Sequence, residues 1–515
     1  VSENARPRVG LFVTCLVDLF RPSVGFATLS LLEKAGCEVI VPEAQTCCGQ
    51  PTFNSGDFRD SRDIAANVIE AFEGFDYVVA PSGSCAGMIR EHYPELFEDD
   101  PAMAMRAQHL AKRTYELTSF LVDIMGMEST GAHHRIALSV VNLVGGQKPR
   151  RLVLGFMIAG ALLSMWISNT STTIMLLPVA ISITIMAPHH FANLPAQQLD
   201  NFEAAVFLGL AYGATLGGIS TMIGTAPNAY AVGFIQSTYG VEVNFLDWMR
   251  FGVPLMLIMV PLAWAILTFL LYPVDFRMTD ELRGVMRRDL TALGPVSATE
   301  KRVMMVFLAT VLAWMSRPYI VGKFGISGIS DTTISIVAVF LLFTVPAGDR
   351  EGALLEWDDM AKLPWGVLLL FGGGFALAAG ITASGLSAWI GGQLAPLSGM
   401  PLLVILFAIA AVLIFLTEIT SNTATITTFL PIIAALAVSL GQPPLQLIVP
   451  VALAASFAFM LPVATPPNAI IFGTGRIRMQ QMIRAGLVLN VLGIFVLGLF
   501  AYYILPLTLD LSVTP

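Results

Sequence analysis

The sequence predicts a mostly α-helical polytopic membrane protein that is preceded by a small α/β domain, and three observations predict this division. Residues 1–130 hold 29 of the 64 Lys, Arg, Asp and Glu side chains, although they form only a quarter of the chain. The remaining residues contain many apolar stretches close to the roughly 20 residues that span a bilayer. In addition, the tripeptide Ser-Asn-Thr occurs twice, each time inside such a stretch.

The charge balance excludes nucleic-acid binding and assigns the acidity to the first segment. Residues 1–130 carry 19 acidic and 10 basic side chains, so the net charge of −8 arises there and the rest is near neutral. No part is basic enough to bind nucleic acid. The apolar run near the start is short, is interrupted by Asp18 and lacks a small-residue cleavage site, so we expect a buried strand and not a signal peptide. We therefore expect this segment to be cytoplasmic.

The first segment alternates strands with helices, which predicts a parallel sheet. The predicted strands are 8–15, 38–43 and 76–83, and the predicted helices are 22–36, 57–74 and 102–126. All five cysteines lie here, and in a cytosolic segment they favour a ligand or redox role over disulfides. Cys37 follows a helix-ending glycine and is expected to serve packing. The other four fall at strand ends or in loops, where metal and redox sites are usually built: Cys15, Cys47, Cys48 and Cys85.

These cysteines stand in the segments VTCLVDLFRP, PEAQTCCGQPTFNSG and APSGSCAGMIREHYPELF. Over about residues 7–127 the pattern resembles the first half of the cysteine-rich CCG iron–sulfur proteins, and is most similar to the lactate-utilisation type. The resemblance implies an electron-transfer role in L-lactate oxidation and an iron–sulfur cluster on the four cysteines. Two features depart from that family. Met88 stands at the last cysteine position, where a thioether is a poor ligand for iron, and the second CCG repeat is absent.

The membrane segment contains two pairs of apolar stretches that meet at the two tripeptides. The first tripeptide is Ser168-Asn169-Thr170 and the second is Ser421-Asn422-Thr423, each with a proline ten residues past its serine. Each pair predicts a re-entrant hairpin with the tripeptide at its tip. The apolar stretches are 151–167, 171–187, 203–222, 249–272, 303–316, 331–346, 364–382, 401–419, 424–440, 446–463 and 485–505.

A second related pair of motifs follows the tripeptides. Ile223-Gly224-Thr225-Ala226-Pro227-Asn228 corresponds to Val463-Ala464-Thr465-Pro466-Pro467-Asn468, and both predict a broken helix. Helix N-termini favour an anion, whereas free carbonyls and hydroxyls favour a hard cation such as Na⁺. A single Ser-Asn-Thr could be a polar packing contact between helices and a single proline a kink. Two matching sets at membrane depth favour a ligand site.

Basic loops predict how the two halves are oriented. They lie at 133–151, 277–302 and 476–484, and the positive-inside rule places them in the cytoplasm. The first hairpin then enters from the cytoplasm and the second from outside, which is an inverted repeat.

The motifs LLSMWISNTSTTIMLLP, IGTAPNAYAVGF, FLTEITSNTATITTFLP and MLPVATPPNAIIFGTG strongly resemble the divalent anion:sodium symporter family over about residues 131–515. The resemblance implies a secondary transporter and not an enzyme. It also implies an elevator mechanism, a small substrate such as a C4-dicarboxylate (succinate, malate, fumarate) or citrate, and a homodimer in the bacterial inner membrane. That family has four further helices before the segment HHRIALSVVNL, and here the α/β domain takes their place.

The resemblance also assigns site residues by position. The first Na⁺ site would use Ser164, Ser168, Asn169 and the Gly224 carbonyl. The second would use Thr417, Thr420, Asn422 and the Ala464 carbonyl. The substrate would meet Asn169, Thr170, Thr225, Asn422, Thr423 and Thr465. Since these motifs contain no Arg or Lys, Na⁺ and helix dipoles would balance the charge of the anion.

The resulting domains follow the chain in order. They are a CCG domain at 1–127, a junction with an amphipathic interfacial helix at 128–150, the first hairpin and half-repeat at 151–273, a cytoplasmic loop at 274–302, scaffold helices at 303–400 and the second hairpin and half-repeat at 401–515. Glu418, beside Thr417, is open to two interpretations: a proton-sensitive group or a hydrogen-bonded structural carboxylate. The rival functional hypothesis is a redox protein of lactate utilisation whose membrane segment is a truncated, inactive transporter.

Overall fold

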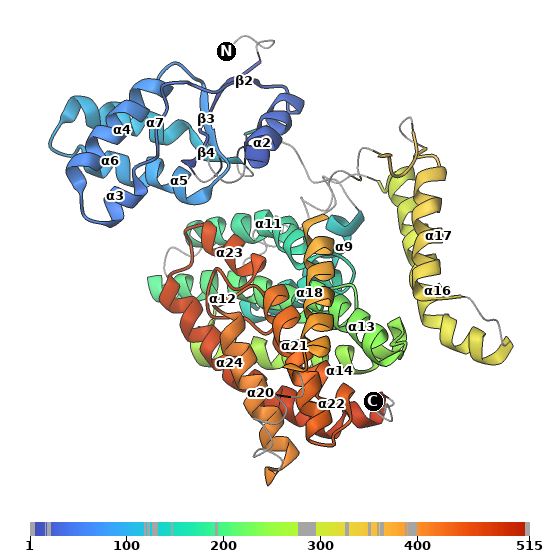
Figure 1. The fold of residues 1–515 in the computed structure, drawn as a ribbon. Helices are drawn as coiled ribbons and strands as arrows, with labels where there is room; N and C mark the ends of the chain where they lie inside the picture. The colour runs from blue at the N-terminus through green and yellow to red at the C-terminus, as the bar shows by residue number, and fades with distance from the viewer. Residues whose placement is uncertain are drawn as a thin grey trace. The chain divides into compact units, whose positions relative to one another are not determined.

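The computed structural model divides the chain into two compact units, which are described separately (Figure 1). The first contains residues 1–129 with 473–475, and the second contains 130–472 with 476–515. The structure describes residues 6–15, 17, 22–117, 120, 124–125, 132–145, 148–190, 194–276, 295–324, 329–348, 352–357, 360, 365–386, 389 and 399–509. The junction at 127–131 and most of the loop at 274–302, with four of its arginines, lie outside the described residues.

The first unit is built on a four-stranded parallel sheet in the order β2-β1-β3-β4, which confirms the predicted parallel sheet. Val9 pairs with both Val39 and Tyr77, so β1 is central. The helices pack their apolar side chains against this sheet; in α4, for example, Phe72 lies 5.6 Å from Phe12 between ring centroids. The strands are β1 (Arg8–Leu11), β2 (Glu38–Ile40), β3 (Tyr77–Ala80) and β4 (Thr114–Glu116).

The predicted helix at 102–126 is wrong at Thr114–Glu116, where the chain forms a strand, and most of 118–126 lies outside the described residues. The helix begins after Asp100, whose side chain accepts from Ala102 N, and ends at Arg113, after which the chain forms β4. Thr114 Oγ1 donates to the Leu110 carbonyl and so closes the last turn. Its backbone then pairs with β3, a long-range partner that local periodicity does not reveal. The helices are α2 (Pro22–Lys34), α3 (Gln50–Asn54), α4 (Phe58–Phe72), α5 (Gly83–Gly87), the π-helical η1 (Met88–His92), α6 (Tyr93–Leu96) and α7 (Pro101–Arg113).

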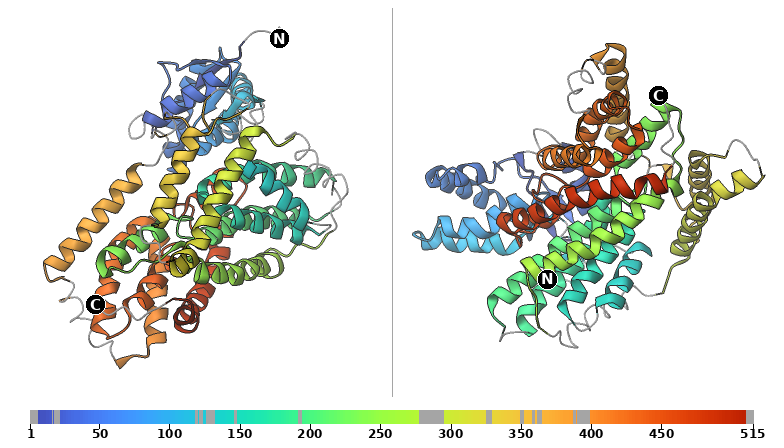
Figure 2. Two further views of the ribbon diagram at one scale, coloured as in Figure 1. Left: turned by 90° about the vertical axis from the view of Figure 1, so that its right-hand side faces the viewer. Right: turned by 90° about the horizontal axis from the view of Figure 1, so that it is seen from below.

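The second unit is helical almost throughout its described residues (Figure 2). In Figure 2 its first half appears in cyan and green and its last third in orange and red. The helices are α9 (Ala132–Gly145), α10 (Pro149–Ser164), α11 (Asn169–His190), α12 (Ala196–Gly218), α13 (Ala226–Tyr239), α14 (Phe245–Ala265), the π-helical η3 (Ile266–Leu271), α16 (Ala298–Phe324), α17 (Asp331–Thr344), α18 (Trp365–Ala383), α20 (Leu402–Thr417), α21 (Asn422–Ser439), α22 (Pro444–Ala454), α23 (Pro466–Gly473), α24 (Met479–Tyr503) and α25 (Leu505–Thr508).

Four helical segments of the described chain are long and apolar enough to cross a membrane. They are Phe245–Leu271, Ala298–Val321, Asn422–Ser439 and Met479–Tyr503. Several further apolar helices are shorter, including Asn169–Ile185 after the first tripeptide and Leu402–Thr417 before the second. This is the distribution expected of a membrane protein in which some apolar helices do not span the bilayer alone.

Three glycines let α12 approach α10 at backbone distance. Gly209, Gly213 and Gly217 recur every four residues and therefore share one face of α12. A Cβ on Gly213 would lie 2.6 Å from the Met157 carbonyl oxygen and 2.7 Å from its Cα. In membranes, where the hydrophobic effect does not drive helices together, small residues at this spacing allow two helix backbones to approach closely.

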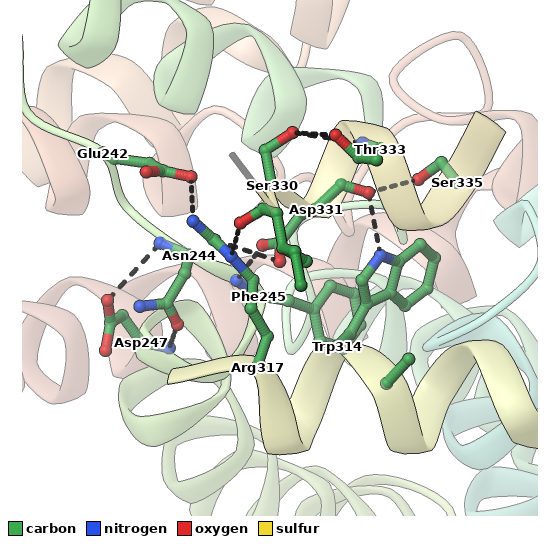
Figure 3. Close-up of polar contacts among 12 residues, drawn as sticks. Glu242, Asn244, Phe245, Asp247, Trp314, Arg317, Ser330, Asp331, Thr333 and Ser335 are labelled. Carbon is green, nitrogen blue, oxygen red and sulfur yellow. Dashed lines mark hydrogen bonds and ion pairs between the residues drawn. The ribbon is translucent and has the colours of Figure 1, made fainter. Parts of the chain in front are cut away.

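A polar network joins the start of α14 to α16 and α17 (Figure 3). Arg317 on α16 contacts Glu242 at 2.6 Å and Asp331 at 3.2 Å. Asp331 Oδ2 also accepts from Phe245 N at 2.7 Å, while its carbonyl accepts from Trp314 Nε1 at 3.1 Å. The network therefore ties the start of α14 to α16 and to the first residue of α17.

Candidate functional site

Both tripeptides lie where a pair of helices is interrupted in the same way. α10 ends at Ser164 and α11 begins at Asn169, whereas α20 ends at Thr417 and α21 begins at Asn422. In each pair the last helical hydroxyl contacts the asparagine side chain five residues later. The sequence repeat is therefore also a repeat of local geometry, and it puts an amide and a hydroxyl together at each helix break.

In the second half, four oxygen atoms from three segments converge. Asn422 Oδ1 lies 2.8 Å from Thr417 Oγ1, 3.1 Å from the Ala455 carbonyl oxygen and 3.2 Å from the Ala464 carbonyl oxygen. Thr417 Oγ1 is itself 2.8 Å from the Ala455 carbonyl. An amide oxygen that faces only oxygens is satisfied in one of two ways: the amide rotates so that its NH₂ donates, or a cation binds among the oxygens.

The first half places its predicted residues in a matching way. Ser164 Oγ donates to Asn169 Oδ1, and a Cβ on Gly218 would collide with that same oxygen and approach Thr225 Cγ2 to 2.7 Å. Thr225 Oγ1 is buried and has no hydrogen-bond partner among the described residues. Gly224 lies in the segment between α12 and α13, where its N–H donates to Thr221 Oγ1 at 3.1 Å.

Two asparagines hold the broken segments, and sequence reasoning assigned them no role. Asn228 Nδ2 donates to the carbonyls of Gly218 and Thr221 at 3.1 and 2.8 Å. Asn468 Nδ2 donates at the same spacings to the carbonyls of Ala458 and Leu461, at 3.2 and 3.1 Å. The Oδ1 atom of each asparagine is buried without a partner among the described residues. The sequence carried a signal for this role, because each asparagine follows a proline at the same position of the two corresponding motifs.

The other predicted residues occupy the helix starts. Ser168 Oγ lies 2.8 Å from Ser171 Oγ and accepts from Ser171 N, so it caps α11. Thr420 Oγ1 donates to the Leu416 carbonyl and lies 2.6 Å from Thr425 Oγ1, so its hydroxyl does not join the Asn422 oxygens. Thr465 Oγ1 accepts from Asn468 N at 3.4 Å. The remaining two, Thr170 and Thr423, are half-buried directly after the two asparagines.

Contacts between the halves bring the two motif sets into one helical body. α13, which follows the first break, packs against α21 and α22. Tyr212 on α12 donates its hydroxyl to the Phe459 carbonyl in the second break at 2.9 Å. Among the residues whose burial the structure describes, Glu418 is the single buried Asp, Glu, Lys, Arg or His side chain. No buried cation among these residues is therefore available to balance an anion.

The four cysteines of the first unit form two sulfur pairs. Cys48 Sγ lies 3.4 Å from Cys85 Sγ, and Cys47 Sγ lies 4.0 Å from Cys15 Sγ. The hydrogen bond that the Cys48 thiol donates to Cys85 Sγ, together with burial, raises the pKa of Cys48 well above its usual range, which disfavours the thiolate that a metal needs. Within the described residues, no group of three or more His, Cys, Asp or Glu side chains is placed to hold a metal ion. The cysteines do not fit the cluster that the resemblance implied.

The family comparison decides the class of the second unit. The family described as the sodium:sulfate symporter transmembrane region matches residues 112–509, which is more than half of the chain. The chain belongs to this sodium:sulfate symporter family. The predicted resemblance is confirmed, and the symporter match begins somewhat before the predicted residue 131. A second match, to the cysteine-rich CCG domain, covers residues 9–90 and confirms the resemblance of the first unit.

Relatives within this family have named functions. The sodium-dependent dicarboxylate transporter SdcS of Staphylococcus saprophyticus is 40% identical over 402 residues, which are 77% of this chain and 77% of that protein. SdcS of Staphylococcus aureus strain USA300 is 38% identical over the same shares. The symporter segment is therefore that of a membrane-embedded secondary transporter and not of an enzyme. The rival hypothesis of a lactate-utilisation redox protein is not favoured.

Proposed function

We propose that this protein couples Na⁺ to the transport of a C4-dicarboxylate such as succinate, malate or fumarate, with citrate as a larger candidate. The observation that carries the proposal is the convergence of Thr417 Oγ1 and the carbonyl oxygens of Ala455 and Ala464 on the side-chain amide of Asn422, which donates to them in one orientation and adds its own oxygen to them in the other. Such a set suits a hard cation. The second Na⁺ site would use Thr417, Asn422 and the carbonyls of Ala455 and Ala464.

The first Na⁺ site would use Ser164, Asn169 and the Gly224 carbonyl, with Ser168 at the adjoining helix start. Support comes from the matching break in the helices and from the contact of Asn169 with Gly218. The unpartnered Thr225 hydroxyl would face substrate. Because no buried Lys or Arg is described near the site, the charge of the dianion would be balanced by the two Na⁺ ions and by the N-terminal ends of α11 and α21.

The residues around the anion would be the amides and hydroxyls of the two tripeptides and the two threonines of the breaks. They are Asn169, Thr170, Thr225, Asn422, Thr423 and Thr465. Both helix pairs would be re-entrant hairpins that move with α12–α14 and α22–α24 as a rigid elevator, against α16–α18 as scaffold in a homodimer. Two short apolar helices beside the tips, Asn169–Ile185 and Leu402–Thr417, and the named function of the relatives support this proposal.

The family and its bacterial relatives support a location in the bacterial plasma membrane. The basic loops support an orientation with the first unit in the cytoplasm. In this arrangement the first unit would take no part in transport chemistry.

Uptake of labelled succinate into proteoliposomes, with and without an inward Na⁺ gradient, tests the proposal. We expect Na⁺-dependent uptake by the full chain, and its loss in Asn169→Ala and in Asn422→Ala. Asn54→Ala, an exposed asparagine of the first unit, is the matched control and should transport normally. Competition by unlabelled malate, fumarate, citrate and sulfate then ranks the substrates. Normal uptake by either site variant would refute the site, and no uptake by well-inserted wild-type protein would refute the function.

A further inference from the structure

Glu418 is a buried carboxylate held by four N–H donors. It follows Thr417 directly and is 2% exposed. Oε1 accepts from Phe459 N at 2.7 Å, from Met460 N at 2.9 Å and from Asn490 Nδ2 at 2.7 Å, and Oε2 accepts from Leu461 N at 2.9 Å. It has no ion pair among the described residues. A buried carboxylate is tolerated when hydrogen bonds replace its water, and here four donors do so.

The three backbone donors are consecutive and lie between α22 and α23, where no helix supplies their partners. A buried N–H without a partner costs about as much as a lost hydrogen bond, so the carboxylate determines the path of this segment. Leu461 carries the effect further, because its carbonyl accepts from Ala464 N at 3.2 Å and from Asn468 Nδ2 at 3.1 Å. Hydrogen bonds therefore connect the carboxylate to Ala464, whose own carbonyl faces the side-chain amide of Asn422.

The first half has no equivalent carboxylate. Met165 follows Ser164 as Glu418 follows Thr417, and the first break is held instead by neutral contacts. Thr221 Oγ1 donates to the Met165 carbonyl at 2.5 Å, and Trp248 Nε1 donates to the Ile219 carbonyl at 3.1 Å. The two halves repeat their amides and hydroxyls but differ by one buried negative charge.

We propose that Glu418 is a positioning residue for the second cation site and makes that site the stronger of the two. The residue does not touch the ion. It fixes the segment that presents the Ala464 carbonyl, and its charge, adjacent to Thr417, favours a cation at Asn422 through a region of low dielectric. The inference rests on the proposed function, which supplies Na⁺ as the ion.

Glu418→Gln tests the proposal, because glutamine keeps the size of the side chain but removes the charge and one acceptor. We expect the Na⁺ concentration for half-maximal succinate uptake to rise about tenfold. Maximal uptake and the succinate half-saturation, both measured at saturating Na⁺, should stay within about twofold. The matched control is Glu203→Gln, which neutralises a carboxylate that pairs with Arg476 at 2.6 Å and does not contact the break. It should keep the wild-type Na⁺ dependence.

Two results would overturn the proposal: a wild-type Na⁺ half-saturation in Glu418→Gln, or a loss of maximal uptake alone, which a merely structural role predicts. If Glu418→Gln does not fold, Glu418→Asp tests the proposal in its place. It keeps the charge but shortens the reach, so it should raise the Na⁺ half-saturation with the succinate value unchanged, and an unchanged Na⁺ value overturns the proposal.

A second measurement separates this inference from the proposed function. The purified full chain is melted in detergent with NaCl or with choline chloride. Na⁺ should raise the melting temperature of the wild type, and should raise that of Glu418→Gln by less than half as much at equal Na⁺ concentration. Equal Na⁺ stabilisation would overturn the role of Glu418. Absence of succinate uptake by a wild type that Na⁺ still stabilises would instead refute the proposed substrate coupling and leave the cation site standing.

Discussion

Replacing Gly213 by alanine should separate α10 from α12 and destabilise the second unit. The new Cβ would lie 2.6, 2.7 and 3.0 Å from the carbonyl oxygen, Cα and carbonyl carbon of Met157, all of them backbone atoms that cannot rotate away. Carbon atoms pack best at about 3.5–4.0 Å, so the helices must move apart by about 1 Å. Gly209 and Gly217 share this face, and their contacts would open as well.

The cost follows from the size of that movement. Overpacking typically costs about 1–3 kcal/mol, and the higher helix propensity of alanine returns up to about 1 kcal/mol. The net loss of about 1–2 kcal/mol, spread over a unit of this size, corresponds to a melting temperature lower by roughly 1–3 °C. Thermal unfolding of the purified chain in detergent, followed by intrinsic tryptophan fluorescence, measures it.

Gly380→Ala in α18 is the matched control for this experiment, because a Cβ there would meet no atom within 4 Å. It should melt at or above the wild-type temperature, since only the gain in propensity remains. If Gly213→Ala melts as high as Gly380→Ala, the backbone contact between α10 and α12 is not the one described, and the reasoning fails.

Three further predictions concern other contacts. Asp331→Ala should cost about 1–3 kcal/mol because it leaves Phe245 N without its part-buried acceptor and removes one of the acceptors of Arg317, whereas Glu242→Ala, at a half-exposed carboxylate, should cost less than about 1 kcal/mol. Equal melting temperatures of the two variants would contradict this. Iodoacetamide should alkylate Cys48 slowly at pH 8.5 in the folded chain and faster in Cys85→Ser, because the hydrogen bond to Cys85 and burial raise the pKa of Cys48. Equal alkylation rates of Cys48 in the two proteins, measured by peptide mass, would contradict this prediction. Folding raises the pKa of Cys48 above the ordinary 9.0, so the protonated thiol stabilises the fold below pH 9.0 and this stability is lost as the pH rises further. Proteolysis within residues 1–117 should therefore accelerate above pH 9.0 in the wild type, and less so in Cys48→Ala.

Local patterns predicted the elements that depend on neighbouring residues. The alternation of strands and helices predicted the parallel sheet, and the two tripeptides predicted where the helices break. The prediction failed at Thr114–Glu116, because this strand is short and exists through its pairing with β3. The hydroxyl–amide pairs at Ser164 and Thr417 were accessible for the opposite reason: their partners are only five residues away.

The residues alone were enough to establish that the chain carries two related sets of small polar side chains in apolar surroundings, and that its cysteines lie in a separate acidic segment. They could not show which carbonyls accompany Asn422, nor that Glu418 reaches a segment more than forty residues away. The reason is physical. Every residue carries the same backbone carbonyl and N–H, and these become ligands or partners only where the chain leaves a helix and folds back, which is decided by the packing of distant helices.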